Sequence, residues 1–262
     1  SSNWFLGIRF PTKIVGYYER FIIYEEQEYQ ESIDRFGTNL TQRFRLKGRS
    51  YVETKSLWEY FADASEDNIQ ERSVSLKVNI DRKDDPLFTR KGLLFNGVIK
   101  SAGFGGSRAY SKIDLTFNTY YPLTKRSVFA MRIQFGKLWG WDNKYGDYSF
   151  EKFYLGGSTS MRGWEVLRFS EDENNEPNGE TIRLMTNIEI RQKIYKSFGM
   201  TIFSDGGLLA EVFPKEFYSE LIWDSGIGIT LDTPLGPARL DYAIQLNDFS
   251  KQKLQLGVQN LF

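Results

Sequence analysis

The feature that most constrains the fold is an alternation of apolar and polar residues that recurs along most of the chain. In residues 73–81, valine, leucine or isoleucine occupies every second position, and serine, lysine, asparagine or aspartate lies between them. The same period recurs, with few interruptions, in residues 112–121, 129–135, 183–191, 238–246 and 254–259. Successive side chains of a β-strand point to opposite faces, so the pattern predicts strands with one apolar and one wet face.

Both a soluble β-sandwich and a transmembrane β-barrel alternate in this way, and three further features favour the barrel. The wet face carries charges of both signs in the middle of strands, which suits a hydrated lumen where they can pair. The predicted strands are about 10–15 residues long, against about five or six in soluble sheets, and a tilted strand of that length crosses a bilayer. Phe, Trp and Tyr make up 16% of a chain that is polar on average, as in barrels with aromatic girdles.

Composition excludes several other classes. No run approaches roughly 18 apolar residues, which a transmembrane helix requires. Cysteine and histidine are absent, which removes disulfides, thiol nucleophiles, the usual zinc sites and every Ser-His-Asp triad. Lysine plus arginine and aspartate plus glutamate total 34 each, so there is no basic surplus for nucleic acid. We therefore expect no metal, no cofactor and no nucleic-acid partner.

The alternating segments and their turns predict an all-β, antiparallel, up-and-down transmembrane barrel in a single domain, residues 1–262. The C-terminal strands are clearest, at about 70–83, 90–103, 107–122, 126–140, 179–194, 197–212, 218–232, 236–247 and 253–262. A hairpin across Lys47–Arg49 and one or two strands between Trp4 and Tyr29 complete the N-terminal part, residues 1–69. Bacterial barrels prefer even strand numbers, so we expect about twelve strands, with fourteen as the alternative. Closure is expected to pair residues 4–10 with residues 254–262, because lipid tolerates no open sheet edge.

One connection, residues 141–178, is much longer than the others. Loops of this size without strands of their own are usually functional or disordered. Its second half, residues 170–177, is acidic and polar, as in a solvated segment. Its first half is rich in glycine and flanked by bulky aromatic residues.

This first half resembles the long-loop signature of the BamA, TamA and FhaC superfamily of outer-membrane assembly and secretion barrels, also called bacterial surface antigen barrels. The signature reads F-x-x-G-G-x-x-S-[VLI]-R-G-[FY]. The chain departs from it only in having Met161 and Trp164 where the family has an aliphatic residue and Phe or Tyr. The aligned residues are Phe153, Gly156, Gly157, Ser160, Met161, Arg162, Gly163 and Trp164.

Further motifs support the resemblance by their order and spacing. Residues 81–92 resemble the family's D-x-R-D-x-x-x-x-P-x-x-G turn, and residues 187–191 its N-x-E-x-R strand. Residues 203–207 resemble F-x-D-x-G, and residues 233–242 closely resemble T-P-x-G-P-x-R-x-D-Y. The resemblance covers residues 70–262, and residues 1–69 are not matched.

The resemblance implies that this extracellular loop, residues 141–178, folds back into the lumen and that Arg162 docks there on Glu189 and Asp205. Arginine suits such a site because its planar fork binds carboxylates in a bidentate manner and stays charged. The alternative is that Glu189 pairs with Arg191 or Arg183 on neighbouring lumen positions.

The C-terminus, residues 255–262, resembles an outer-membrane β-signal, the address that the assembly machinery reads. Gly257 and the terminal Phe262 carry the likeness, while Asn260 stands where an aromatic residue is usual.

For function, the resemblance implies a bacterial outer-membrane barrel that inserts other barrels or translocates polypeptides. An alternative is a barrel that anchors a patatin-like phospholipase whose catalytic domain lies outside this chain, and a second is a small-solute pore. The chain itself holds no catalytic constellation, since G-x-S-x-G fails at Ser160 and at Ala109. Expected partners are outer-membrane lipid, including lipopolysaccharide, client polypeptides and fused or associated periplasmic domains. The sequence leaves the oligomeric state open.

Overall fold

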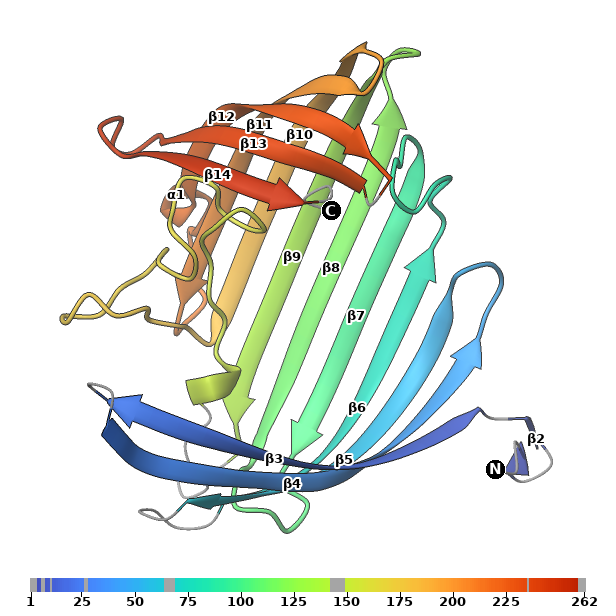
Figure 1. Cartoon of the computed structure of the whole chain (residues 1–262), viewed down its shortest axis with the longest axis vertical. Helices are drawn as coiled ribbons and strands as arrows, with labels where there is room; N and C mark the ends of the chain where they lie inside the picture. Colours follow the sequence, from blue (N-terminus) through green and yellow to red (C-terminus); the bar gives the residue numbers. More distant parts are fainter. Residues whose placement is uncertain are drawn as a thin grey trace. The chain divides into compact units, whose positions relative to one another are not determined.

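The computed structural model describes residues 4–5, 8–9, 11–25, 28–63, 69–141, 149–234 and 236–258. In this part of the chain, one sheet of twelve strands follows the chain order from β3 to β14 (Figure 1). Every pair whose register is described is antiparallel. The strands are β3 (Thr12–Glu25), β4 (Glu28–Arg45), β5 (Tyr51–Asp63), β6 (Ile69–Asp81), β7 (Gly92–Ala102), β8 (Tyr110–Pro122), β9 (Ser127–Gly140), β10 (Ile182–Tyr195), β11 (Phe198–Ala210), β12 (Ile222–Thr233), β13 (Gly236–Gln245) and β14 (Gln252–Val258).

The expectation of an all-β, up-and-down fold with twelve strands in the sheet is confirmed. The hairpin across Lys47–Arg49 is also confirmed, since it joins β4 to β5. Helix is confined, among the described residues, to the short segments η1 (Ser149–Glu151) and α1 (Phe217–Glu220). None of these helices is long and apolar enough to cross a membrane.

Two expected strand positions are wrong. β1 (Trp4–Phe5) pairs with β2 (Ile8–Arg9) in a separate two-stranded sheet, so this segment is not the first strand of the large sheet. Pro11 follows it, and a proline cannot donate to a strand ladder, so the large sheet begins after it, at β3. The strand expected over 218–232 begins only at Ile222, because α1 occupies the residues before it.

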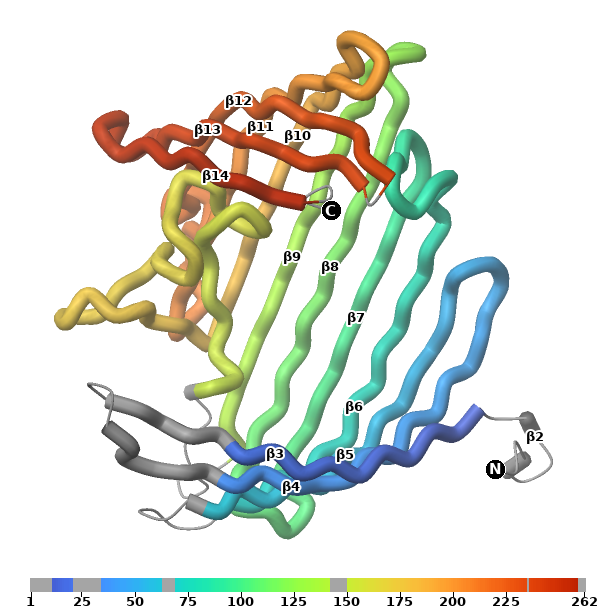
Figure 2. Tube along the Cα trace, viewed as in Figure 1, coloured from blue at the N-terminus to red at the C-terminus, as the bar shows by residue number. Residues whose placement is uncertain are grey.

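The chain forms two compact units. Unit 1 contains residues 1–79, 97–113 and 138–150, and unit 2 contains residues 80–96, 114–137 and 151–262. The single domain expected over 1–262 stays a prediction. Unit 2 holds β10–β14 and residues 151–181, which lie beside these strands and do not extend the sheet (Figure 2).

On the strands of unit 2, many large apolar side chains of one face are exposed, whereas several charged side chains of the other face are buried. On β13, Leu240 and Tyr242 are exposed, whereas Asp241 between them is fully buried. On β12, Ile227 is 55% exposed while Asp224 is 0% exposed. A soluble sheet shows the opposite arrangement, so this distribution is typical of strands whose outer face meets lipid.

Nine apolar side chains of the alternating segments are exposed or half-buried. Val74, Leu76, Phe117, Leu240, Leu254 and Leu256 are exposed. Val78, Leu115 and Ile244 are half-buried.

Candidate functional site

The candidate site is built on one row of polar side chains that crosses five neighbouring strands. The register places one residue each from β9, β10, β11, β12 and β13 opposite one another. Directly opposed residues share a face of the sheet, so their side chains lie together. We call this set the polar row: Arg132, Asn187, Asp205, Asp224 and Gln245.

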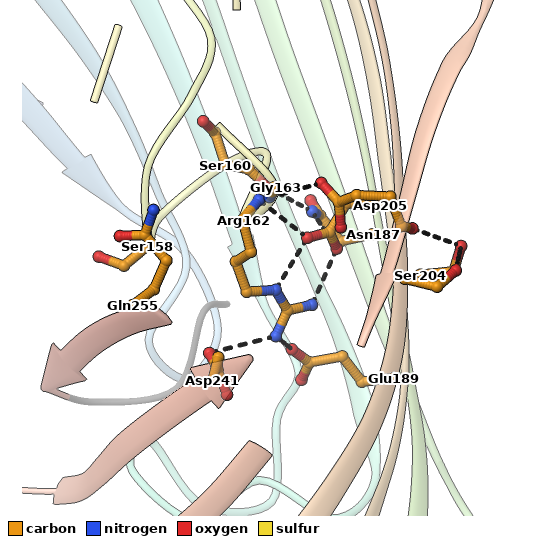
Figure 3. Close-up of polar contacts among 12 residues, drawn as sticks. Ser158, Ser160, Arg162, Gly163, Asn187, Glu189, Ser204, Asp205, Asp241 and Gln255 are labelled. Atoms are coloured by element: carbon orange, nitrogen blue, oxygen red, sulfur yellow. Dashed lines mark hydrogen bonds and ion pairs between the residues drawn. The ribbon is translucent and has the colours of Figure 1, made fainter. Parts of the chain in front are cut away.

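Residues 153–164, the docking segment, lie over the polar row. Arg162 is the centre of the contact and is 0% exposed. Its Nε and Nη2 each donate to one carboxylate oxygen of Asp205 at 2.8 Å, and its Nη1 donates to Glu189 Oε1 at 2.7 Å (Figure 3). Asp241 Oδ2 lies 3.5 Å from the same Nη1. The guanidinium carbon of Arg162 lies 3.4 Å from the ring centre of Phe203. The carboxylates therefore bind the edge of the guanidinium, and the aromatic ring covers one of its faces.

The backbone of the docking segment is also bound by the polar row. The N–H of Arg162 donates to Asp205 Oδ2 at 3.3 Å, and the N–H of Gly163 donates to Asp224 Oδ2 at 2.9 Å. Gln245 Nε2 donates to the carbonyl of Gly163 at 2.9 Å. A Cβ at position 163 would lie 2.8 Å from Asp224 Cβ, so glycine is required for this approach.

Three further side chains hold the carbonyl groups just before Arg162. Arg239 Nη2 donates to Ser158 O, and Arg132 Nη2 donates to Thr159 O, each at 2.8 Å. Asn187 Nδ2 donates to Ser160 O at 2.7 Å. Side chains of β9, β10 and β13 thus bind three consecutive carbonyl groups of the docking segment.

The apolar side chains of the docking segment form a small core. Met161 is fully buried with Leu155, Trp164 and Met185 of β10. This core gives the segment a hydrophobic contact in addition to its polar ones.

Two glycines shape the turn that presents Arg162. Gly156 and Gly157 have φ angles of 115° and 93°, which side chains of L-residues rarely adopt. The hydroxyl of Ser160 closes the turn: it accepts from the N–H of Gly156 at 2.8 Å and lies 2.9 Å from its carbonyl oxygen. The loop motif therefore combines a turn, a buried core and a charge.

We expect Gly156→Ala to loosen the docking segment, because its Cβ would lie 2.1 Å from the carbonyl oxygen of Glu165. The cost of the strained φ alone is about 1–3 kcal/mol. Trypsin cleavage of the loop should therefore become faster. Gly48→Ala is the matched control, since Gly48 also has a positive φ but its Cβ would meet nothing within 4 Å. Equal cleavage in the two variants would contradict the expectation.

The structure places the expected site residues as follows. Arg162 contacts both Glu189 and Asp205, and Glu189 Oε2 also accepts from Arg191 Nε at 2.7 Å, so the two alternatives for Glu189 coexist. Arg183 instead pairs with Asp114 at 2.6 Å.

The remaining loop residue, Phe153, is buried, and its ring lies where a Cβ of Gly136 would be. Gly257 of β14 leaves room for Arg239, whose Nη2 would lie 2.7 Å from a Cβ there. Phe262 lies outside the described residues, so the β-signal stays a prediction.

Sequence reasoning did not assign to the site several polar residues that contact the docking segment, including Arg132, Asn187, Asp224, Arg239, Asp241, Gln245 and Gln255. In the sequence, Arg132, Asp241 and Gln245 each lie between two apolar residues. This alternation indicates that they face the polar side of the sheet. Their convergence depends on strand register. Among the described residues, no group of three acidic side chains is arranged to hold a metal ion.

Comparisons with known proteins agree with this fold. The "Sorting and assembly machinery component 50 homolog" of Mus musculus is 33% identical over 95 residues, which is 36% of this chain and 20% of the mouse protein. A SAM50-like protein of Schizosaccharomyces pombe is 23% identical over 207 residues, 71% of this chain and 43% of that protein. The chain thus spans less than half the length of these curated relatives.

Two solved bacterial structures share the fold. BamA from Haemophilus ducreyi lacking POTRA domains 1–3 matches with a TM-score of 0.73 at 14% identity, over 97% of this chain and 59% of that one. CdiB from Acinetobacter baumannii matches with a TM-score of 0.50 at 12% identity, over 94% of this chain and 45% of that one.

The family match extends beyond the segment that the loop motif identified. Residues 16–260 match the Omp85 superfamily domain, which includes most of residues 1–69. The match confirms the expected resemblance. The chain belongs to the Omp85 superfamily.

Proposed function

We propose that this chain is an outer-membrane barrel that inserts or translocates polypeptides. The proposal is supported by one arrangement: one face of the sheet exposes apolar side chains, and Arg162 binds the long loop to the other, polar face. The mouse relative's name describes a sorting and assembly component, and the same role is proposed here.

Closure into a barrel is part of the proposal. β3 and β14 are the terminal strands in the sheet order. An unpaired strand edge is too costly in hydrocarbon, so we expect these two strands to meet in the membrane.

The docked segment favours polypeptide handling over the two alternatives. A diffusion pore leaves its polar face to water, whereas here the docking segment covers that face across β9–β13. A barrel that only anchors an enzyme needs its lipid-facing strands and no fixed internal loop.

A bacterial outer membrane is the location we propose. Omp85 relatives come from a mammal and a yeast as well as from bacteria, so membership in the superfamily leaves the organism open. Lipid, lipopolysaccharide and periplasmic domains are proposed partners in this setting.

Reconstitution tests the function. The purified chain is placed in phospholipid vesicles, a urea-denatured β-barrel client is added, and client folding is followed by its heat-modifiable electrophoretic mobility. The proposal predicts faster folding than in empty vesicles or in vesicles with an unrelated barrel. Equal rates in all three would contradict insertion, and protease protection of an added secreted polypeptide then tests translocation. Failure of both would leave the anchoring role.

A further inference from the structure

A second polar site lies at the other end of the strands that carry the docking segment. A cavity of about 180 Å³ opens where the β8–β9, β10–β11 and β12–β13 turns meet, at the opposite end of these strands from residues 151–181. Its charged lining residues are Arg90, Arg126, Arg191, Lys193 and Asp232. The cavity lies within unit 2.

The lining carries an excess of positive charge. Lys193 Nζ lies 3.3 Å from Asp232 Oδ2, and Arg191 Nε lies 2.7 Å from Glu189 Oε2. Arg90 and Arg126 form no ion pair with any residue that the structure describes. Two guanidinium groups therefore face the cavity region without a carboxylate of their own, and such groups favour an anionic ligand.

One turn binds the guanidinium of Arg90 and the backbone of Arg126. Thr124 Oγ1 accepts from the N–H of Arg126 at 3.1 Å, and Thr124 O accepts from Arg90 Nη2 at 2.8 Å. Asp84 Oδ1 accepts from the N–H of Arg90 at 3.0 Å, which fixes the β6–β7 connection beside the turn. A guanidinium that is fixed before binding, as that of Arg90 is, reduces the entropy cost of holding a ligand.

The cavity lies on the polar face of the sheet, and this position indicates whether its ligand comes from water or from the lipid bilayer. Arg191 and Lys193 lie two and four residues after Glu189 on β10, so they share its polar face. The exposed apolar side chains lie on the opposite face, where lipid is expected. A ligand therefore reaches the cavity from water, along the polar face, which favours a polypeptide over a bilayer lipid.

The remaining walls suit a peptide. Phe88 and Val128 add apolar surface, and Thr89, Thr201 and Thr230 add hydroxyl groups. We propose that this cavity binds a carboxylate of an acidic polypeptide segment. The inference rests on the proposed function only in that it takes a polypeptide as the ligand, and it adds a preference for acidic segments.

Peptide binding to the full chain tests the inference. The chain is placed in nanodiscs of zwitterionic lipid, and the fluorescence anisotropy of labelled oligoglutamate and oligoglutamine is measured. We expect oligoglutamate to bind and to weaken as salt is raised, because salt screens exposed charges. Arg90→Gln/Arg126→Gln should bind it about tenfold more weakly, since charge-assisted hydrogen bonds are lost. Arg168→Gln is the matched control, because Arg168 pairs with Glu171 and lies outside the cavity lining, and it should bind as the parent does.

The outcomes separate the possible ligands. Equal binding of oligoglutamine, or unchanged binding by the double variant with the parent's heat-modifiable mobility, would overturn the inference. Displacement by inorganic phosphate as readily as by free glutamate would show a general anion site, and displacement by anionic lipid in the nanodisc would show a lipid site. Either result would overturn the peptide assignment. Client insertion without oligoglutamate binding would refute this inference alone, whereas binding without insertion or translocation would refute the proposed function alone.

Discussion

Replacing Arg162 with alanine is expected to release the docking segment while the strands still fold. The substitution removes the buried cation that binds both Asp205 and Glu189, and of these two only Glu189 keeps another ion pair within the described residues, with Arg191. Both carboxylates are at most 2% exposed. Breaking a buried ion pair in this way costs about 3–5 kcal/mol. The strands retain their own ladder hydrogen bonds, so the loss should be confined to the loop. Limited trypsin digestion should therefore cut faster after Lys152 or Arg168.

Two variants make this expectation specific. Arg162→Lys should restore the loop only in part, because an ammonium group cannot bind both oxygens of Asp205 and also Glu189 in the same geometry. Arg43→Ala is the matched control, since Arg43 pairs with Glu53 at 2.6 Å but its side chain is exposed. Exposed pairs contribute about 0–1 kcal/mol. If Arg162→Ala is cleaved no faster than Arg43→Ala, the docking role assigned to Arg162 is wrong.

The second large effect is expected on the opposite face of the sheet. Ile227 is near the middle of β12 and is 55% exposed. If this face meets lipid, Ile227→Arg places a charge in hydrocarbon and should lower the free energy of unfolding by about 2–4 kcal/mol. Urea unfolding in phospholipid bilayers, followed by tryptophan fluorescence, measures the difference.

A volume-conserving change controls for packing at the same position. Ile227→Leu should change the free energy of unfolding by less than about 1.5 kcal/mol. On a water-exposed surface, arginine at this position would be tolerated within about 0.5 kcal/mol. A value in that range for Ile227→Arg would show that the face meets water.

Much of the fold could be predicted from the alternation. Residues 70–83 and 126–140 were expected as strands, and the structure has β6 and β9 within two residues of those bounds. A period of two identifies a strand and its two faces without any tertiary information. The strand prediction was wrong at a place where apolar and polar residues do not alternate. Phe217 and Tyr218 are adjacent aromatic residues, and they begin a helix where a strand was expected.

The candidate site could be predicted only in part. Arg162, Glu189 and Asp205 were placed together by resemblance to a known loop motif. Asp224 and Gln245 were not, although they bind the backbone of Gly163. Their place depends on the registers β11–β12 and β12–β13, and a slip of one residue would turn them to the other face. Alternation fixes a face, but it does not say which residues of neighbouring strands stand opposite one another.

Spin labels on β14 test most directly whether the sheet presents one face to lipid and the other to the loop. Leu254 and Leu256 are exposed, whereas Gln255 between them donates to Trp164 O of the docking segment at 2.8 Å. Each residue is replaced singly by cysteine, labelled, and measured in phospholipid bilayers for collision with oxygen and with a water-soluble nickel complex. The account predicts high oxygen collision and low nickel collision at 254 and 256, and low oxygen collision at 255. Equal nickel collision at all three positions, or oxygen collision greatest at 255, would contradict it.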